Sequence, residues 1–239
     1  MELKKYNKEN NYSYSFGAFP TYELLQNHIE DVIEVIVHEK ISKSTELDNI
    51  LHECQAHNIP LRTNGKIIEK LSGKGNIYIM GVFKKYSCRV DNSKNQVLLV
   101  NPSDMGNLGT IIREMLGFGY NNLSIIKPCA DIFDPKVIRA SMGAIFSMNI
   151  ELFDNIDNFL LVNKNHKYPF MLQATTPLHS LSNKITPHTL IFGNEATGLD
   201  DTYLTIGTPV IIKHSNKIDS LNLSMSASIA LYEFSRGNF

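Results

Sequence analysis

The sequence lacks the features that mark several classes of protein. Its 239 residues contain no tryptophan and only three cysteines, which are too few and too scattered for a disulfide framework or a zinc site. No apolar run reaches the length of a transmembrane helix, and the polar N-terminus has no signal-peptide core. We therefore expect a cytoplasmic protein with no membrane segment and no bound metal.

Neither sign of charge is in excess. Lysine and arginine number 23 against 24 aspartate and glutamate residues, for a formal net charge of −1. These numbers exclude nucleic-acid binding through bulk charge and leave only a local basic patch for that purpose. The hydrophobic share of 43% and the charged share of 20% are those of an ordinary globular protein and exclude a disordered chain.

The common nucleotide-binding motifs are also missing. Gly117-Phe118-Gly119 resembles the start of a dinucleotide-binding fingerprint, but it follows a predicted helix where the fingerprint requires a strand. Asn122 stands where the third glycine belongs. A helix C-cap at Gly117 explains the pattern better, and there is no Walker A sequence. A nucleotide-dependent oxidoreductase is therefore disfavoured, and a cofactor-binding titration would test it.

A polar, turn-rich stretch at residues 91–95 predicts a linker between two domains. Residues 1–90 alternate between helices and strands and are interpreted as a small α/β domain without a catalytic constellation. A β-branched strand is expected at 32–37, a helix capped by Ser44 follows it, and a second helix stops at Gly73.

Residues 96–239 alternate more clearly between predicted strands and predicted helices. Apolar strand runs separated by helices predict a parallel sheet that is buried on both faces. One helix is expected to end at Gly117, another to follow Pro135, and the last to run from Ser220 to Phe234. The strands are expected at 96–100, 123–126, 148–153, 170–174, 189–192 and 209–212.

Three segments of this second domain place polar residues beside glycines at strand ends: residues 101–113, 190–199 and 219–227. Ligands of open α/β sheets bind at the carboxyl ends of the strands. Each segment alone also has an ordinary structural interpretation. These are a capped helix with Arg113 on its surface, a turn with a solvated Glu195, and a helix N-cap at Ser220.

Together, the three segments resemble motifs 1, 2 and 3 of the SpoU–TrmH family of RNA 2′-O-ribose methyltransferases, within the SPOUT superfamily. The order and spacing of the motifs agree with the family over residues 96–236, and residues 134–144 resemble a further family block. The N-x-G-x-x-x-R pattern is matched by Asn107, Gly109 and Arg113, the G-N-E-G-x-G-L pattern by Gly193, Asn194, Glu195, Gly198 and Leu199, and the S-L-N-x-S pattern by Ser220, Leu221, Asn222 and Ser224.

The resemblance implies a parallel α/β sheet whose C-terminal chain forms a trefoil knot. It also implies S-adenosylmethionine bound within the knot. The matching positions for the cofactor are Gly193, Ile212 and Leu221, with Thr175 as a weaker candidate. Residues 1–90 are similar to the family's small substrate-binding domain of ribosomal-protein L30e type, and we expect them to bind RNA.

The resemblance also assigns the catalytic residues. Arg113 has the central role, and because a guanidinium is a poor base we expect it to position the ribose hydroxyl and stabilise charge. Asn107 and Glu195 are expected to orient Arg113 and the loops, whereas Ser220 and Asn222 are expected to order the knot and reach the substrate. The family works as a homodimer. Ribosomal RNA is the preferred substrate, with a tRNA 2′-O-methyltransferase or a non-catalytic RNA-binding protein as alternatives.

Three positions depart from the family pattern near the expected cofactor loops. Ala196 replaces a glycine of motif 2, which is tolerable only if its backbone φ is negative. Asp104-Met105 precedes Gly106 where Asp-Pro is frequent, and Lys213-His214 follows Ile212 where Pro-Met is common. Lys213 adds a charge that either weakens cofactor binding or helps to bind RNA.

Overall fold

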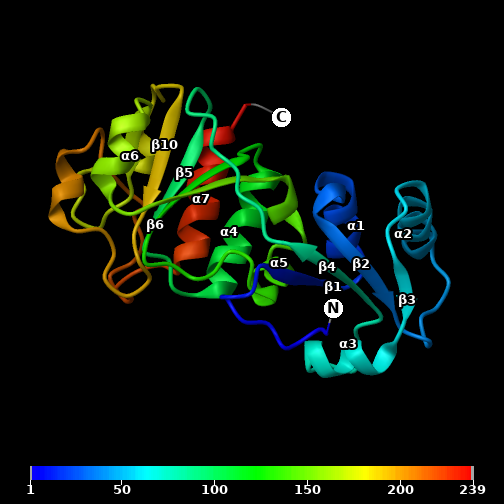
Figure 1. Ribbon diagram of the computed structural model, residues 1–239. Helices are drawn as coiled ribbons and strands as arrows, with labels where there is room; N and C mark the ends of the chain where they lie inside the picture. The colour runs from blue at the N-terminus through cyan, green and yellow to red at the C-terminus, as the bar shows by residue number, and fades with distance from the viewer. Residues whose placement is uncertain (1, 238–239) are drawn as a thin grey trace. The chain divides into compact units, whose positions relative to one another are not determined.

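A computed structural model describes residues 2–237, which divide into two compact units (Figure 1). Unit 1 runs to Tyr86 and also takes in Asp131–Ser147, whereas unit 2 consists of Ser87–Ala130 and the chain from Met148 onward. This division differs from the predicted one. The stretch at residues 91–95 belongs to unit 2, where the N–H of Asp91 donates to the side chain of Asn122 at 2.9 Å.

Unit 1 contains a four-stranded mixed sheet in the order β1-β4-β2-β3. β4 is antiparallel to β1 and β2, and β2 is parallel to β3. The strands are β1 (Tyr12–Phe16), β2 (Val32–Val37), β3 (Leu61–Thr63) and β4 (Ile79–Lys84), and the helices of this part of the chain are α1 (Ala18–Asn27), η1 (Ile29–Asp31), α2 (Thr45–Ala56) and α3 (Gly65–Ser72).

The predicted elements of unit 1 are confirmed where local signals are strong. Ser44 caps α2 by accepting the N–H of Leu47 at 3.2 Å, and Gly73 ends α3 in the left-handed conformation with a φ of 65°. β1 and α1 were not predicted. The sequence of β1, Tyr-Ser-Tyr-Ser-Phe, does alternate aromatic and polar residues and could have indicated a strand, and its serines are buried along with its aromatic rings.

Two apolar cores lie on opposite faces of this sheet. Alternate residues of a strand point to opposite faces, so Ile36 packs toward α3 whereas Val35 and Val37 pack toward α2. The core on the α3 side includes Tyr12, Tyr14, Ile68, Leu71, Met80 and Val82; the core on the α2 side includes Leu25, Leu47, Ile50, Cys54 and Ile79.

The segment Asp131–Ser147 contains α5 (Pro135–Ala140) and η2 (Ala144–Ser147), which contact β1 and α1 respectively. Asp134 caps α5 and confirms the helix expected after Pro135. Ser13 donates its hydroxyl to the carbonyl of Phe133 at 2.5 Å, and Phe83 makes edge-to-face ring contacts with Phe133 and Phe146. Unit 1 is therefore built from two separate stretches of sequence.

Unit 2 is built on a five-stranded sheet in the order β7-β6-β5-β10-β8, in which every neighbouring pair is parallel. The predicted parallel sheet is confirmed. The strands are β5 (Gln96–Val100), β6 (Asn122–Ile126), β7 (Asn149–Phe153), β8 (His166–Pro169) and β10 (His188–Phe192). β9 (Thr176–Pro177) and β11 (Val210–Ile211) pair with each other in a small parallel sheet.

Helices cover both faces of the large sheet. α4 (Met105–Gly117) and α7 (Leu223–Ser235) pack against each other, and Figure 1 shows them together beside β5 and β10. α6 (Ile156–Val162) packs through Phe159 on the core that contains Leu98, Val100 and Ile191. The short helices η3 (Leu178–Ser180) and η4 (Asp201–Thr205) lie in the connections on either side of β10.

Three local expectations for unit 2 are wrong. Residues 170–174 follow β8 and do not form a strand of the large sheet, and β11 pairs outside that sheet. Asn222, not Ser220, caps the last helix. By contrast, α4 ends at Gly117 as expected, and the residue with positive φ after this helix, 79°, is Gly119.

In residues 2–237 no helix is both long and apolar enough to cross a membrane. The trefoil knot and the cytoplasmic location stay predictions.

Candidate functional site

The carboxylate of Glu195 joins the loop after β10 to the start of α4. Its Oε2 accepts the N–H and the hydroxyl of Ser103 at 3.1 and 3.0 Å, and its Oε1 accepts the N–H of Asp104 at 3.1 Å. The side-chain amide of Asn107 donates to Oε1 at 3.4 Å. Two segments separated by about 90 residues are thus held together by one side chain.

These hydrogen bonds also fix the charge of Glu195. Burial alone raises the pKa of this carboxyl, but the hydrogen bonds from the N–H groups of Ser103, Glu195 and Asp104 and from the Ser103 hydroxyl outweigh burial and hold the pKa below its usual value. The side chain is therefore ionised near neutral pH. Because both oxygens already accept several hydrogen bonds, Glu195 acts as an acceptor that organises the loops.

Asn107 connects this network to α7. Its side-chain carbonyl accepts a hydrogen bond from the side-chain amide of Asn222 at 3.1 Å. Asn222 also caps α7, because its side-chain oxygen accepts the N–H groups of Ser224 and Met225 at 2.9 and 3.3 Å. One polar network therefore joins the segments 101–113, 190–199 and 219–227.

Asn194 shapes the loop after β10. Its side-chain amide donates to the carbonyl of Asn101 at 2.7 Å, and its side-chain oxygen accepts the N–H of Ala196 at 2.8 Å. Asn101 directly follows β5 and has a positive φ of 52°, a conformation that asparagine tolerates better than most residues. The φ of Ala196 is not positive, so this replacement of the family glycine causes no backbone strain.

Gly193 is required by close packing of two backbone segments. A Cβ built on Gly193 would lie 2.2 Å from the carbonyl carbon of Gly198 and 2.5 Å from the nitrogen of Leu199. Its φ is not positive, so backbone conformation is not the reason for the glycine. The loop folds back on the end of β10, and the N–H of Gly198 donates to the carbonyl of Asn194 at 2.9 Å.

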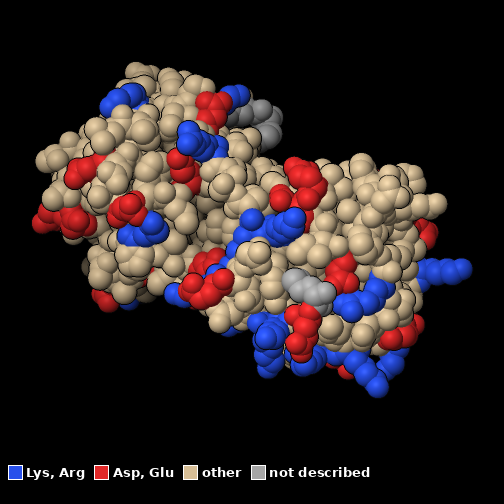
Figure 2. Space-filling model, viewed as in Figure 1, with Lys and Arg blue, Asp and Glu red and all other residues tan. Residues whose placement is uncertain are grey.

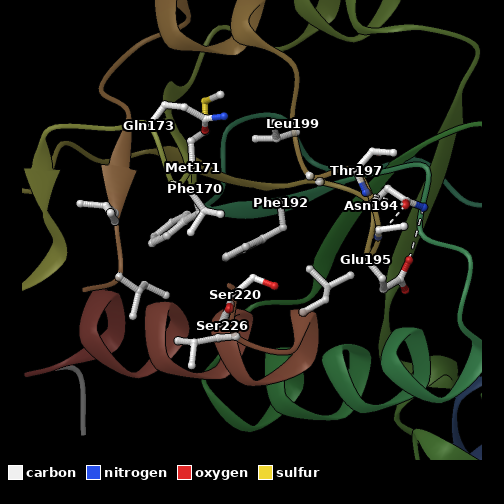
Figure 3. Close-up of a pocket in the computed structure, with 18 of the residues that line it drawn as sticks. Phe170, Met171, Gln173, Phe192, Asn194, Glu195, Thr197, Leu199, Ser220 and Ser226 are labelled. Carbon is white, nitrogen blue, oxygen red and sulfur yellow. Dashed lines mark hydrogen bonds between the residues drawn. The ribbon is translucent and has the colours of Figure 1, made fainter. Parts of the chain in front are cut away.

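A pocket of about 220 Å³ lies beside this network (Figure 3). The rings of Phe170 and Phe192 stack at a centroid distance of 4.7 Å and form one apolar wall, and Ser220 and Ser226 lie on the side toward α7. The lining combines apolar and amide groups. It comprises residues 170–173, Phe192, residues 193–199, Ile211, Ile212, His214, Ser220, Leu221, Leu223 and Ser226.

The structure brings most of the predicted site residues together. Gly193, Ile212 and Leu221, the positions expected to hold the cofactor, all line the pocket, as do Glu195 and Ser220. Asn107 and Asn222 belong to the polar network beside it. Thr175 is exposed, precedes β9 and does not line the pocket.

Arg113 stands apart from this group. It is exposed on α4 and is not among the residues that line the pocket. Within residues 2–237 its side chain makes no hydrogen bond and no ion pair, and the side chains of Asn107 and Glu195 do not contact it through such bonds. Asn107 and Gly109 lie inside α4, on the same helix as Arg113.

Sequence reasoning missed several residues of the site. Asp104 caps α4 by accepting the N–H of Asn107 at 2.7 Å, and an aspartate immediately before a helical run is a recognisable cap signal. Phe170 and Gln173 line the pocket, where only tertiary contacts bring them, whereas His214, which lines it too, is one of the noted departures from the family pattern. Lys213, the other departure from the family pattern, does not line it. Among residues 2–237, no group of three or more His, Cys, Asp and Glu could hold a metal.

Comparisons with known proteins agree with this geometry. The SpoU rRNA Methylase family matches residues 94–232. A 23S rRNA (adenosine(1067)-2′-O)-methyltransferase from Streptomyces laurentii is 30% identical over 150 residues, which cover 61% of this chain and 56% of that protein. A 23S rRNA (uridine(2479)-2′-O)-methyltransferase from Streptomyces viridochromogenes is 28% identical over 145 residues, with coverages of 57% and 50%. The chain spans about half the length of the curated relatives it matches.

The fold is shared over almost the whole chain. An AdoMet-bound rRNA methyltransferase from Sinorhizobium meliloti superposes with a TM-score of 0.80 at 21% identity, covering 96% of this chain and 88% of that one. The family match extends from the start of β5 to the last helix and includes all three segments of the polar network. The chain therefore belongs to the SpoU rRNA methylase family.

Proposed function

We propose that this protein is an S-adenosylmethionine-dependent RNA methyltransferase that transfers a methyl group to a ribose 2′-hydroxyl, with ribosomal RNA as its substrate. The observation that carries the proposal is the polar network of Glu195, Asn107 and Asn222 beside an apolar, amide-lined pocket. Two relatives named as 23S rRNA 2′-O-methyltransferases support the choice of ribosomal RNA.

The pocket suits S-adenosylmethionine. An adenosyl group needs apolar walls and a few amide or hydroxyl partners rather than opposite charges. Leu199, Ile211 and Leu221 supply apolar surface, Gln173 and Ser220 supply polar groups, and no lysine or arginine lines the pocket. Gly193, Ile212 and Leu221 would hold the cofactor, which supplies the methyl group when bound.

The chain's own residues would act by positioning the loops of the site and the ribose hydroxyl. Glu195 is saturated with hydrogen bonds, so it holds the loops and takes no proton. Arg113 would hold the ribose hydroxyl in line and stabilise the charge that develops on its oxygen. The proton of the hydroxyl then leaves to water or to a phosphate of the RNA.

The position of Arg113 supports a homodimer in which Arg113 of one subunit completes the pocket of the other. Arg113 is exposed and unpaired on α4, within the part of the chain that the structure describes. The outer side of the adjacent α7 is apolar: Met225, Ile229 and Tyr232 are 51%, 42% and 60% exposed. Exposed apolar side chains at helical spacing are typical of an interface. Ile229→Glu should yield monomers in light scattering and abolish methyl transfer.

Two alternative functions predict different outcomes of a methylation map. A tRNA 2′-O-methyltransferase is favoured by the similarity to a tRNA (cytidine/uridine-2′-O-)-methyltransferase from Citrobacter koseri, at 27% identity over 150 residues. A non-catalytic RNA-binding protein would keep the fold without binding the cofactor.

The deciding experiment maps ribose methylation in cellular RNA with and without the gene. The proposal predicts the loss of one or a few 2′-O-methyl marks from ribosomal RNA, restored by the wild-type gene but not by Arg113→Ala. A mark lost only from tRNA would assign the first alternative. An unchanged map, with no binding of S-adenosylmethionine in calorimetry, would assign the second.

A further inference from the structure

His214 is placed differently from its neighbours in the loop between β11 and α7. Lys213 and residues 215–219 are exposed, whereas His214 is partly buried and lines the pocket. At this position the family pattern commonly has a methionine. This chain therefore replaces an apolar side chain of the pocket wall with one that can form hydrogen bonds and carry a charge.

A hydrogen bond to the backbone fixes the tautomer of the His214 ring. Nδ1 lies 3.0 Å from the carbonyl oxygen of Ser215, and because a carbonyl oxygen only accepts, Nδ1 carries the proton. In the neutral ring Nε2 is therefore an acceptor. Within residues 2–237 nothing donates to it. The side chain thus offers the pocket an acceptor for as long as the ring is neutral.

The other polar residues of the pocket wall do not have this property. Glu195 is the second titratable residue of the described lining, but both of its oxygens already accept hydrogen bonds from the chain. Its pKa is held below the usual value, so it stays ionised near neutral pH. Gln173, Ser220 and Ser226, labelled in Figure 3, both donate and accept and do not titrate there. His214 is therefore the lining residue whose hydrogen bonding changes near neutral pH.

The charged residues around this loop do not reach the pocket wall. Lys213, Lys217 and Asp219 belong to the loop but do not line the pocket, and within residues 2–237 they form no ion pair. Asp104, which contacts Glu195 through its N–H, uses its carboxylate to cap α4. On the face of unit 2 that Figure 2 displays, basic and acidic side chains are interspersed. A positive charge gained inside the pocket would therefore be a distinct local change.

S-adenosylmethionine brings both hydrogen-bond donors and a permanent positive charge. Its adenosyl half carries an amino group and two hydroxyls, which can donate to a neutral imidazole nitrogen, and its sulfonium repels a second positive charge. Protonation of the ring would remove an acceptor and add a like charge in one step. S-adenosylhomocysteine has the same adenosyl half without the sulfonium charge, so only the loss of the acceptor applies to it.

We propose that neutral His214 accepts, at Nε2, a hydrogen bond from the adenosyl half of S-adenosylmethionine, and that protonation of His214 weakens cofactor binding. This inference rests on the proposed function and deepens it, because it makes the cofactor affinity of this chain depend on pH. It leaves the transfer step unchanged, with Arg113 and the polar network in the roles assigned above.

Calorimetric titration of the full chain with each cofactor form, from about pH 5.5 to about pH 8, tests the proposal. Wild-type affinity for S-adenosylmethionine should fall on the order of tenfold toward the acid end, and affinity for S-adenosylhomocysteine on the order of threefold. His214→Gln keeps an amide near the place of Nε2 but does not titrate, so it should bind nearly as the wild type does at the alkaline end and show no decline.

Two further variants complete the comparison. His214→Met restores the common family residue and removes the acceptor, so binding should be about threefold to tenfold weaker than wild type at the alkaline end and independent of pH. His179→Gln changes an exposed histidine of η3 that does not line the pocket and should keep the wild-type profile. Thermal melting without cofactor at each pH confirms that every variant is folded where it is titrated.

The outcomes separate this inference from the proposed function. A decline toward acid pH in His214→Gln and His214→Met that parallels the wild type would overturn the inference while S-adenosylmethionine remains the cofactor. Binding by His214→Met as tight as that of the wild type at the alkaline end would overturn it as well. If the wild type binds S-adenosylmethionine at no pH, the proposed function itself fails, and the inference fails with it.

Discussion

The side-chain amide of Asn222 donates a hydrogen bond to the side-chain carbonyl of Asn107 at 3.1 Å, across 115 residues of sequence. The contact ties the first turn of α7 to the first turn of α4. It also orients the Asn107 amide toward Glu195, since the carbonyl of the same side chain is already occupied.

Two variants of Asn222 separate its two roles. Asn222→Asp keeps the acceptor for the N–H groups of Ser224 and Met225, so stability should change by less than about 1 kcal/mol. It cannot donate to Asn107, so methyl transfer should fall. Asn222→Ala loses the cap as well and should destabilise the protein by about 0.5–2 kcal/mol. Urea unfolding and initial rates measure the two effects; full activity of Asn222→Asp would show that the Asn107 contact is dispensable.

Substitutions of two glycines in one loop should act differently. Gly193→Ala forces a Cβ onto the backbone of Gly198 and Leu199, so the pocket loop must move, with weaker S-adenosylmethionine binding and a stability loss of about 1–3 kcal/mol. Gly198 has a φ of +68° but open space around it, so Gly198→Ala should cost about 1–2 kcal/mol of strain and leave cofactor affinity closer to wild type. Calorimetric titration and thermal melting test both. Normal cofactor binding by Gly193→Ala would remove this loop from the cofactor site.

Arg113→Ala should abolish methyl transfer without disturbing the fold. The side chain is exposed and makes no hydrogen bond or ion pair among residues 2–237, so the free energy of unfolding should change by less than about 0.5 kcal/mol. Cofactor affinity should stay near wild type because Arg113 does not line the pocket. Arg89→Ala, which removes another exposed arginine of unit 2, is the matched control. Near-normal turnover by Arg113→Ala would contradict its assigned role.

The stability of the protein should fall between about pH 6.5 and pH 4 through His188. Its Nδ1–H donates to the carbonyl of Ile185 at 3.0 Å, so Nε2 accepts the hydroxyl of Tyr120 at 2.7 Å and the buried ring is neutral. Burial lowers the pKa of His188 from 6.5 to about 4. The unfolded chain therefore takes up a proton in this range before the folded one does, and stability is lost as the pH falls.

Between about pH 6.5 and pH 4, the free energy of unfolding should fall by on the order of 2–3 kcal/mol because of His188. Urea unfolding at several pH values measures it. His188→Gln should flatten this part of the profile while lowering stability at pH 7, whereas His52→Gln, at a side chain that is 78% exposed, should keep the wild-type profile. A profile of His188→Gln that parallels the wild type would show that other groups cause the decline.

Local sequence determined much of the fold. The β-branched and apolar runs predicted β2, β5, β6 and β10, and the parallel sheet followed from their alternation with helices. Ser44 and Gly73 marked helix ends because caps depend on a few neighbouring atoms. The motif spacing also singled out the residues that meet in the polar network, although a local pattern does not show which hydrogen bonds join them.

Only the tertiary structure decided which distant segments belong together. Asp131–Ser147 has no local signal that distinguishes it from the chain around it, yet its contacts with β1 and α1 place it in unit 1. The motif match predicts a cofactor contact at Gly193, whereas the backbone of Gly198 is the neighbour that requires a glycine at this position. Thr175 and Gly193 are both small residues near strand ends, but only the latter reaches the pocket. Caps and strand runs depend on neighbours in sequence, whereas packing and hydrogen bonds across 90 residues or more depend on how the whole chain folds.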